Sequence, residues 1–222
     1  MISAIILAAG KSERMGGGVD KAFLSLNGKP VVAWSLLAFE HCADIDQIVL
    51  VVRKDQLKAA EAMSRMFGIS KLVKVVSGGS CRQESVMCGL SACDADTRKV
   101  VIHDGARPLV KPEMIAKIIA ALKRNAAVTL GRPVTDTIKR CEKSEVVCET
   151  VSRANLWSVQ TPQGFDYAAL KSAYAKLKQK DVTDDCMVME LAGGSVKIVE
   201  SLEPNVKITV ASDLALATAL MR

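Results

Sequence analysis

Short apolar runs alternate with longer amphipathic stretches along the first half of the chain. Residues 4–9, 47–52, 72–76 and 100–103 are compact runs of Val, Ile, Leu and Ala, bounded by polar residues or glycine. Runs of this length and composition are typical of strands that are buried on both faces of a sheet. These four runs constrain the fold more than any other feature of the sequence.

Helices are predicted between the apolar runs. Residues 31–40 follow Pro30 and residues 113–124 follow Pro112, and proline suits the first turn of a helix. Residues 54–67 are rich in Ala, Met, Lys and Glu. Strand and helix in alternation predict an α/β fold with a mostly parallel sheet flanked by helices. Ligands of such sheets bind beyond the carboxyl ends of the strands.

The alternation stops after residue 126. Residues 127–132, 137–140, 146–151 and 157–161 are short strand-like pieces without a long helix between them. They predict an inserted β-arm at about residues 132–155, within a single domain that spans residues 1–222. The pattern then predicts helices at 167–178, 184–192 and 211–222, and strands at 196–201 and 206–210.

Composition limits the classes of function. Thirty Lys and Arg against 24 Asp and Glu give a net charge of +6, but no block of five or six like charges occurs. This scatter argues against nucleic-acid or membrane partners and suits an enzyme for polyphosphates. The apolar N-terminal run is too short to span a membrane. Seven cysteines without a CxxC pair argue against zinc and predict free thiols in a reducing cytoplasm.

A loop rich in small residues follows the first predicted strand, with the sequence AAGKSERMGGG at residues 8–18. Small residues at the end of a strand let backbone amides approach an anionic ligand. Arg14 and Lys21 bracket a glycine-containing turn and could both reach a triphosphate. Neither the dinucleotide fingerprint nor the Walker pattern is present. A glycine-rich surface loop with solvated charges is the alternative interpretation.

A second loop, SGGSCRQESV at residues 77–86, follows the third predicted strand. Its two glycines expose backbone amides, and a predicted helix begins just after them, where acceptor groups are favoured. Ser85 would lie about one turn into this helix, where its hydroxyl could meet a base or a ribose. The alternative is an ordinary helix start that is capped by Ser80.

The fourth predicted strand ends in IHDGARP, at residues 102–108. Asp104 could hold Mg²⁺ or substrate hydroxyls there, and Arg107 could contact a phosphate. An internal Asp–Arg pair that fixes the loop is the alternative. His103 is expected to pack at the strand end rather than to act as a catalytic base.

These loops occur in a longer series of segments. AAGKSERMG, SGGSCRQESVMCGL, VIHDGARPLV, PVTDTIKR, VSRANLWSVQTPQGF, VTDD and NVKIT follow one another over essentially the whole chain. Together they closely resemble the 2-C-methyl-D-erythritol 4-phosphate cytidylyltransferases of the non-mevalonate isoprenoid pathway. The resemblance implies a Rossmann-like nucleotidyltransferase, a homodimer with exchanged arms, and transfer of CMP from CTP to the acceptor with release of pyrophosphate.

The resemblance also implies roles for individual residues. Arg14 and Lys21 would stabilise charge on the phosphates of CTP, and Arg153 and Lys207 would position the attacking phosphate. The remaining matched positions bind substrates: Ala8, Ala9, Gly10, Gly79 and Ser85 for CTP, Asp104, Arg107, Thr161 and Lys207 for the sugar phosphate, and Thr137 and Arg153 on the arm that is lent to a neighbouring subunit. Near residue 204 the family often has an Asp that contacts the substrate hydroxyls, and whether Glu203 replaces it stays open.

The implied reaction agrees with the residues present. A phosphate nucleophile is already ionised at neutral pH, so fixed Arg and Lys side chains with Mg²⁺ suffice and no general base is needed. Two other functions stay open from the sequence. One is a ribitol-5-phosphate cytidylyltransferase, which would share the CTP loops, and the other is a CTP-sensing domain without catalysis.

Overall fold

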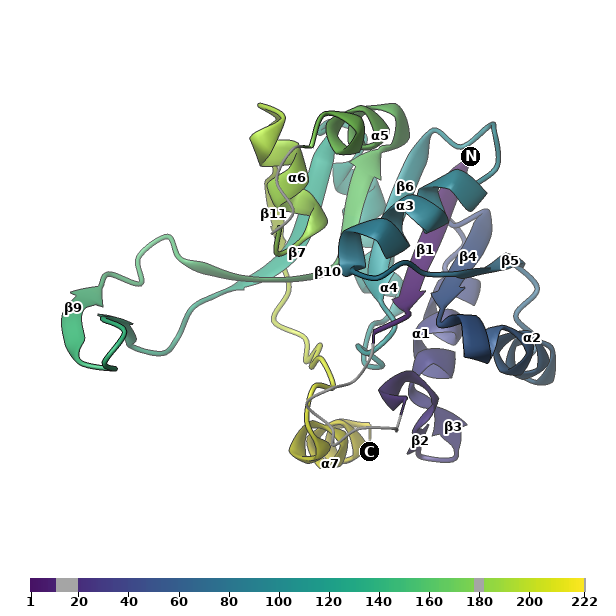
Figure 1. Ribbon diagram of the computed structural model, residues 1–222, viewed down its shortest axis with the longest axis horizontal. Helices are drawn as coiled ribbons and strands as arrows, with labels where there is room; N and C mark the ends of the chain where they lie inside the picture. Colours follow the sequence, from purple (N-terminus) through teal and green to yellow (C-terminus); the bar gives the residue numbers. More distant parts are fainter. Residues whose placement is uncertain (11–19, 178–181, 222) are drawn as a thin grey trace.

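A seven-stranded sheet with helices on both faces forms the centre of the molecule (Figure 1). The computed structural model describes residues 1–10, 20–177 and 182–221 of the 222-residue chain. The strand order across the sheet is β11-β7-β10-β6-β1-β4-β5. The seven strands are β1 (Ile2–Ala8), β4 (Gln47–Val52), β5 (Leu72–Ser77), β6 (Lys99–Asp104), β7 (Ala127–Pro133), β10 (Trp157–Asp166) and β11 (Lys197–Glu200).

The sheet is mostly parallel, as the sequence predicts. β1 pairs in parallel with β4 and β6, and β4 pairs in parallel with β5. β11 runs parallel to β7, whereas β10 is antiparallel to both β6 and β7. The chain continues from β1 to β4 on one side and later to β6 on the other. Such a reversal of strand order opens a crevice at the carboxyl end of β1.

Each face of the sheet has its own apolar cluster. Ile6 of β1 packs with the cluster that includes Leu36 and Ile115, whereas its neighbour Ile5 belongs to the cluster with Leu90 and Leu170. Successive strand residues point to opposite faces, so a continuous apolar run is buried on both sides. The helices are α1 (Val31–Glu40), α2 (Leu57–Met66), α3 (Arg82–Ala92), α4 (Pro112–Ala121), α5 (Tyr167–Lys176), α6 (Asp185–Leu191) and α7 (Ala211–Leu220).

Most predicted elements form, with shifted ends. The predicted helix at residues 31–40 has the bounds of α1, while the one at 54–67 starts as a 3-10 turn, Lys54–Gln56, before α2. The strand predicted at 157–161 is only the first half of β10. Its second half pairs with β6, and a register shift between Gln160 and Gln163 accommodates Pro162.

The strand predicted at residues 206–210 is wrong. The segment forms no ladder with the sheet, and the Ile208 N–H donates to the carbonyl of Ala106 at 2.8 Å instead. The Ile208 side chain is buried in a small third cluster with Leu26, Val31 and Ala217. Its apolar pattern therefore reflects a packed loop, which periodicity cannot tell from a paired strand.

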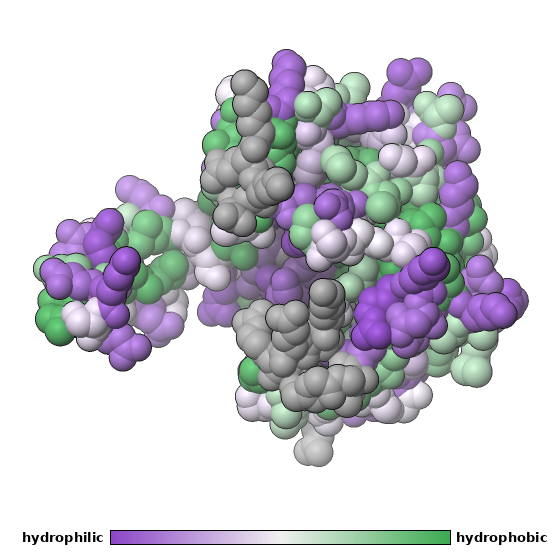
Figure 2. All heavy atoms as spheres, in the orientation of Figure 1, coloured by the Kyte–Doolittle hydropathy of each residue, from purple (hydrophilic) through white to green (hydrophobic). Residues whose placement is uncertain are grey.

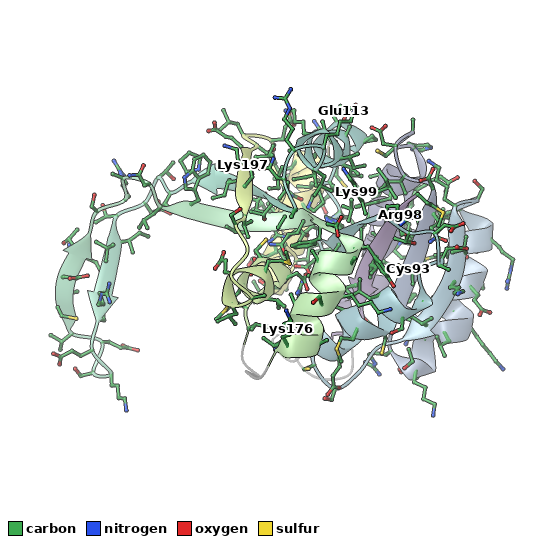
Figure 3. The ribbon with its side chains drawn as sticks, turned by 90° about the horizontal axis from the view of Figure 1, so that it is seen from above. Cys93, Arg98, Lys99, Glu113, Lys176 and Lys197 are labelled. Carbon is green, nitrogen blue, oxygen red and sulfur yellow. The ribbon has the colours of Figure 1, made fainter. Side chains whose placement is uncertain are left out.

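Two short hairpins lie outside the main sheet. β2 (Ser25–Leu26) pairs with β3 (Lys29–Pro30), and β8 (Ile138–Cys141) pairs with β9 (Val147–Val151). The β8–β9 hairpin is the end of an arm that stands away from the body in two perpendicular views (Figures 1 and 3). Hydrophilic and hydrophobic residues are intermixed on its surface (Figure 2). Val146 and Val147, at its tip, are 61% and 53% exposed.

Candidate active site

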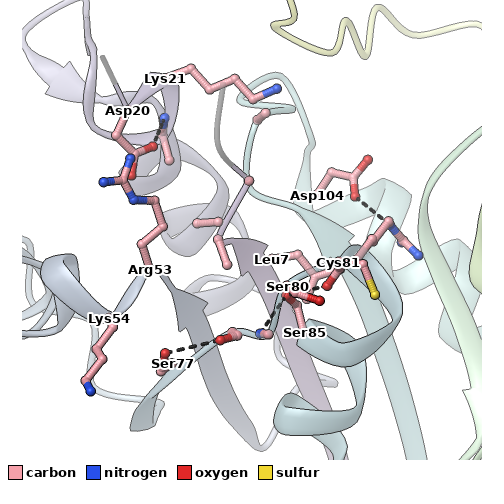
Figure 4. A pocket seen from close by; sticks show the side chains of 18 of the residues that line it. Leu7, Asp20, Lys21, Arg53, Lys54, Ser77, Ser80, Cys81, Ser85 and Asp104 are labelled. Atoms are coloured by element: carbon pink, nitrogen blue, oxygen red, sulfur yellow. Dashed lines mark hydrogen bonds and ion pairs between the residues drawn. The ribbon is translucent and has the colours of Figure 1, made fainter. Parts of the chain in front are cut away.

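A cavity of about 1040 Å³ opens at the carboxyl ends of β1, β4, β5 and β6 (Figure 4). This is the edge of the sheet where the sequence predicts ligands to bind. Its walls come from the loops that follow these strands, from the 3-10 turn Lys21–Phe23 and from the C-terminal segment. The lining residues are Leu7–Gly10, Asp20–Ala22, Arg53–Asp55, Ser77–Arg82, Ser85, Asp104, Ala106, Lys207 and Thr209.

The loops after β1 and β5 meet in the cavity with little space between their backbones. A Cβ on Gly78 would lie 2.5 Å from Cβ of Ala9, and a Cβ on Gly79 would lie 2.3 Å from Cβ of Glu84. Glycine at 78 therefore permits the approach of the two loops, and glycine at 79 permits the turn into α3. The predicted CTP residues Ala8, Ala9, Gly10, Gly79 and Ser85 all line this part of the cavity.

The start of α3 differs from the second sequence interpretation, while Ser85 lies one turn into the helix and lines the cavity, as the first predicts. Cys81 is the N-cap and provides no side-chain cap, so capping by Ser80 is wrong. Instead Ser80 donates its backbone N–H and its hydroxyl to Glu84, at 2.6 and 2.8 Å. The Ser85 hydroxyl donates to the Cys81 carbonyl at 2.9 Å and accepts the Gly79 N–H at 3.3 Å. In this structure Ser85 thus fastens the glycine loop to the helix.

Three cations surround the carboxylate of Asp104 at the end of β6. Lys207 Nζ lies 2.7 Å from Oδ2, Arg107 Nε lies 3.9 Å from the same oxygen, and Arg82 Nε lies 3.6 Å from Oδ1. Burial alone would raise the pKa of the Asp104 carboxyl, but these cations outweigh burial and hold it well below its usual range. We call these four residues the Asp104 cluster. It unites the predicted residues Asp104, Arg107 and Lys207.

Arg82 belongs to the site although the sequence did not predict it there. Its Nη2 donates to Oδ2 of Asp185 at 2.8 Å, and the Tyr174 hydroxyl donates to Oδ1 of the same carboxylate at 2.5 Å. Asp185 is fully buried at the start of α6. Burial would lower the pKa of Arg82, but Asp185 and Asp104 raise it, so the cation is fixed. Arg82 is the first residue of α3 and lies between Gly79 and Ser85, two predicted CTP residues, and this position in the sequence could have indicated that it belongs to the site.

Arg107 is a nearly buried cation in the cluster. Its Nη1 donates to the Asn205 carbonyl at 2.8 Å, while its Nε is buried and has no hydrogen-bond partner among the described residues. Burial lowers the pKa of Arg107, and the charge of Asp104 opposes this. Arg107 is not among the residues that line the cavity, so it lies behind Asp104 and not on the cavity surface.

Two further predicted residues lie directly behind the cluster. Thr161 Oγ1 accepts the backbone N–H of Asp104 at 3.0 Å and contacts Nδ1 of His103 at 3.0 Å. Thr161 is 4% exposed and is not among the residues that line the cavity. His103 is fully buried, which confirms the expectation that it packs at the strand end.

Of the two predicted catalytic cations near the N-terminal loop, the structure describes Lys21 but not Arg14. Lys21 lines the cavity, in a turn where Asp20 accepts the Ala22 N–H at 3.0 Å. Arg14 lies outside the described residues. Arg53 and Lys54 also line the cavity and were missed, although they follow directly on the buried strand β4.

The two predicted arm residues lie apart from the cavity of their own chain. Thr137 and Arg153 are exposed near the base of the β8–β9 hairpin, and neither lines the cavity. Arg153 Nη1 donates to the Thr135 carbonyl. Glu203 does not reach the cavity either, since its carboxylate binds Lys111 Nζ at 2.6 Å on an exposed surface.

The described residues form no cage of several metal ligands. They contain no group of three or more His, Cys, Asp or Glu that could bind an ion. Asp104, the predicted ligand, already has a cation beside each of its oxygens. In the part of the chain that the structure covers, no helix is long and apolar enough to cross a membrane.

Comparison with known proteins agrees with this site. Residues 2–222 match the family described as 2-C-methyl-D-erythritol 4-phosphate cytidylyltransferase. The curated protein of that name from Halalkalibacterium halodurans is 41% identical over 221 residues, which are 99% of this chain and 96% of the relative. The one from Desulforamulus reducens is 41% identical over 224 residues, covering 100% of this chain and 96% of the relative.

Solved structures show the same likeness. The crystal structure of 4-diphosphocytidyl-2C-methyl-D-erythritol synthase from Anaerococcus prevotii has a TM-score of 0.87 at 33% identity and covers 100% of this chain and 98% of that chain. The 2-C-methyl-D-erythritol 4-phosphate cytidylyltransferase from Thermus thermophilus has a TM-score of 0.80 at 32% identity, with 98% and 97% covered. Neither ribitol phosphate transfer nor CTP sensing is favoured by these matches. The chain therefore belongs to the 2-C-methyl-D-erythritol 4-phosphate cytidylyltransferase family and transfers CMP from CTP to 2-C-methyl-D-erythritol 4-phosphate, which gives 4-diphosphocytidyl-2-C-methyl-D-erythritol and pyrophosphate.

Proposed function

We propose that the acceptor phosphate binds at the Asp104 cluster and that CTP lies between the loops after β1 and β5. The observation that carries this assignment is the cluster itself: three cations converge on one carboxylate at the floor of the cavity. Asp104 keeps the cations in place, and three positive charges outweigh its single negative charge. The cluster therefore attracts a dianionic phosphate, to which Arg82 and Lys207, the two of its cations that line the cavity, can donate.

The chemistry requires positioning and charge stabilisation. An oxygen of the acceptor phosphate forms a bond to the α-phosphorus of CTP, and the bond from that phosphorus to the bridging oxygen of pyrophosphate breaks. The nucleophile needs no base, because it is already ionised. Lys207 would orient it, while Lys21 and Arg14 would stabilise the charge on the triphosphate. Loss of one such donor typically lowers the rate about 10²–10³-fold.

A divalent cation, Mg²⁺, would enter with the nucleotide. Mg²⁺ keeps several waters and is commonly bound by substrate phosphates with few protein carboxylates. This suits a cavity whose described residues form no metal cage. We therefore assign Asp104 to the acceptor side and not to the ion.

The reaction would take place in a reducing cytoplasm. All seven cysteines are free thiols, and Cys81, Cys141 and Cys148 are exposed. Exposed thiols of this kind persist where disulfides are kept reduced. No thiol has a role in the proposed transfer.

The arm would complete the active site of a second copy of this chain. A two-stranded ribbon is marginal in water by itself and needs a partner surface. The exposed Val146 and Val147 support such a contact. Exchange of arms in a two-fold homodimer would bring Thr137 and Arg153 to the neighbour's acceptor phosphate.

Complementation between subunits tests this assignment. Arg153→Ala and Lys21→Ala proteins, each nearly inactive, are mixed under conditions of subunit exchange, and pyrophosphate release is measured. If arms cross, one site of the heterodimer has both lesions and the other has none. Activity should then return to about half that of a wild-type dimer for each heterodimer.

A matched mixture gives the opposite result. The Arg153→Ala/Lys21→Ala double variant is exchanged with wild-type protein, so that in a crossed-arm heterodimer each site has one lesion and both sites fail. If Arg153 instead acts in its own subunit, this second heterodimer keeps half its activity and the first recovers none. That pattern would refute arm exchange.

A further inference from the structure

Four hydrogen bonds form a closed circuit behind the Asp104 cluster. Arg107 Nη1 donates to the Asn205 carbonyl at 2.8 Å, and Asn205 Nδ2 donates to the Thr161 carbonyl at 2.8 Å. Thr161 Oγ1 lies 3.0 Å from His103 Nδ1, and His103 Nε2 lies 3.2 Å from the Arg107 carbonyl. The circuit joins the end of β6, the middle of β10 and the C-terminal segment, which are distant in sequence.

The chemistry of the partners fixes the direction of each bond. A carbonyl oxygen only accepts, so Nε2 of His103 must have the hydrogen that points to Arg107. Burial lowers the pKa of His103 to about 4, so the ring is neutral at physiological pH. Nδ1 is then an acceptor, and the Thr161 hydroxyl must donate to it. His103 thus has one tautomer, with its hydrogen on Nε2.

This direction determines what Thr161 can do. Its single hydroxyl hydrogen is used by His103, and its oxygen accepts the backbone N–H of Asp104 at 3.0 Å. Thr161 is only 4% exposed, and its hydroxyl has no further hydrogen to donate to a phosphate. Thr161 therefore holds the main chain at Asp104, while His103 holds the main chain at Arg107.

The other contacts of the loop reinforce this arrangement. The Arg107 N–H donates to the Asp104 carbonyl at 2.9 Å, and the Ser35 hydroxyl, with one hydrogen to donate, lies 3.3 Å from both the Gly105 and the Arg107 carbonyls. The ring of Phe39 packs on His103 with centroids 5.3 Å apart. His103, Asn205 and Thr161 are all nearly or fully buried, so bulk water does not compete for these bonds.

We propose that His103 is a positioning residue for the transfer reaction. Its neutral ring, with the hydrogen on Nε2, acts together with Thr161 to fix the main chain at Asp104 and Arg107, and so sets the position of both side chains for the acceptor phosphate. Thr161 then serves the acceptor through the Asp104 backbone and not by direct contact. The inference rests on the proposed binding of the acceptor at the Asp104 cluster. It gives His103 a role in catalysis although the ring touches no substrate.

Substitutions at both ends of the His103–Thr161 bond test the proposal. Gln at 103 can keep its amide nitrogen as a donor for the Arg107 carbonyl but then has no atom at the position of Nδ1 to accept from Thr161, and Val at 161 removes the hydroxyl with nearly the same shape. Each of H103Q and T161V should lower kcat/KM for the acceptor about 10–10²-fold, the usual effect of small misplacement. KM for CTP should stay near the wild-type value in both variants.

The double variant separates positioning from direct contact. Because both substitutions break the same bond, H103Q/T161V should be no worse than T161V alone. If Thr161 contacts the phosphate independently, the two losses multiply, and the proposal is wrong. Unchanged acceptor kinetics in the single variants would overturn it as well.

A control and a direct observation complete the experiment. T97V removes another buried hydroxyl, one that bonds Ser3 at 2.7 Å at the far end of β6, and should leave acceptor kinetics unchanged. If wild-type protein and T97V release pyrophosphate, and H103Q and T161V show the same kcat/KM for the acceptor as wild type, only this inference is refuted. Inactive wild-type protein would instead refute the function.

The tautomer can be read in the wild-type protein, which removes any dependence on folding of the variants. The chain has two histidines, so ¹⁵N-histidine spectra at neutral pH contain His41 and His103 alone, and a His41→Gln sample assigns them. His103 should be neutral with its hydrogen on Nε2. A protonated ring, or a hydrogen on Nδ1, would contradict the proposed circuit.

Discussion

Two Arg–carboxylate pairs of this protein have the same length and opposite surroundings. Arg82 Nη2 lies 2.8 Å from Asp185, with side chains 26% and 0% exposed. Arg140 Nε lies 2.8 Å from Glu149 on the arm, with side chains 69% and 52% exposed. The first pair joins α3 to α6 and continues to Asp104 in the cavity, whereas the second joins two strands of an isolated hairpin.

The difference shows how the two regions obtain their geometry. In the body the acceptor cluster is fixed by the chain's own buried groups: Asp185 and Tyr174 hold Arg82, and His103 and Thr161 hold the main chain at Asp104. On the arm solvent competes for every pair, so ion pairs add little. Only a second surface, the proposed partner subunit, would give Arg153 a fixed position.

Removal of the buried carboxylate should have the largest effect on stability. Asp185→Ala leaves Arg82 with only Asp104 at 3.6 Å and leaves the Tyr174 hydroxyl without its acceptor. Breaking a buried pair in this way usually lowers the free energy of unfolding by about 3–5 kcal/mol. Urea denaturation measures the loss. A change below about 0.5 kcal/mol, the range of ordinary surface substitutions, would remove the contrast with the arm.

The pH dependence of stability sharpens the comparison, because it depends on a buried group of the body. The pKa of His103 is about 4 in the folded chain and about 6.5 when exposed. Between these values the unfolded chain binds one more proton, so stability falls as the pH falls, by about 1.4 kcal/mol per pH unit. Above pH 6.5 His103 contributes no slope.

His103→Gln should reduce the slope of unfolding free energy against pH by that amount between pH 4 and 6.5. Denaturation series for wild type and variant at several pH values measure it. Equal slopes for the two proteins would mean that His103 titrates alike in the folded and unfolded chains, so that burial does not lower its pKa.

The sequence predicted the body well and its side-chain connections poorly. Continuous apolar runs identified β1, β4 and β6 because strands buried on both faces leave that pattern. The run at 72–76 also forms a strand, but β5 lies at the edge of the sheet and has no buried residue, so its prediction as a buried strand was wrong. The position of Asp104 followed, since strand ends of a parallel sheet meet at one edge. In the network Tyr174–Asp185–Arg82, Arg82 contacts a carboxylate that lies 103 positions later in the chain, and no local pattern encodes such a contact. The packed loop at 206–210 was mistaken for a strand because an apolar run looks the same in both.

The smallest expected effect is on the arm, and it completes the comparison. Glu149→Ala removes the partner of Arg140 at a distance equal to that in the buried pair. Because both side chains are more than half exposed, water solvates Arg140 once its partner is gone, and the unfolding free energy should change by only about 0.2–1 kcal/mol. The measurement is the same urea series as for Asp185→Ala. Repeating it at high salt should abolish the remaining difference, since salt screens exposed charges. A loss of several kcal/mol would mean that Arg140 and Glu149 are covered in solution, and would itself indicate that the arm lies against another surface.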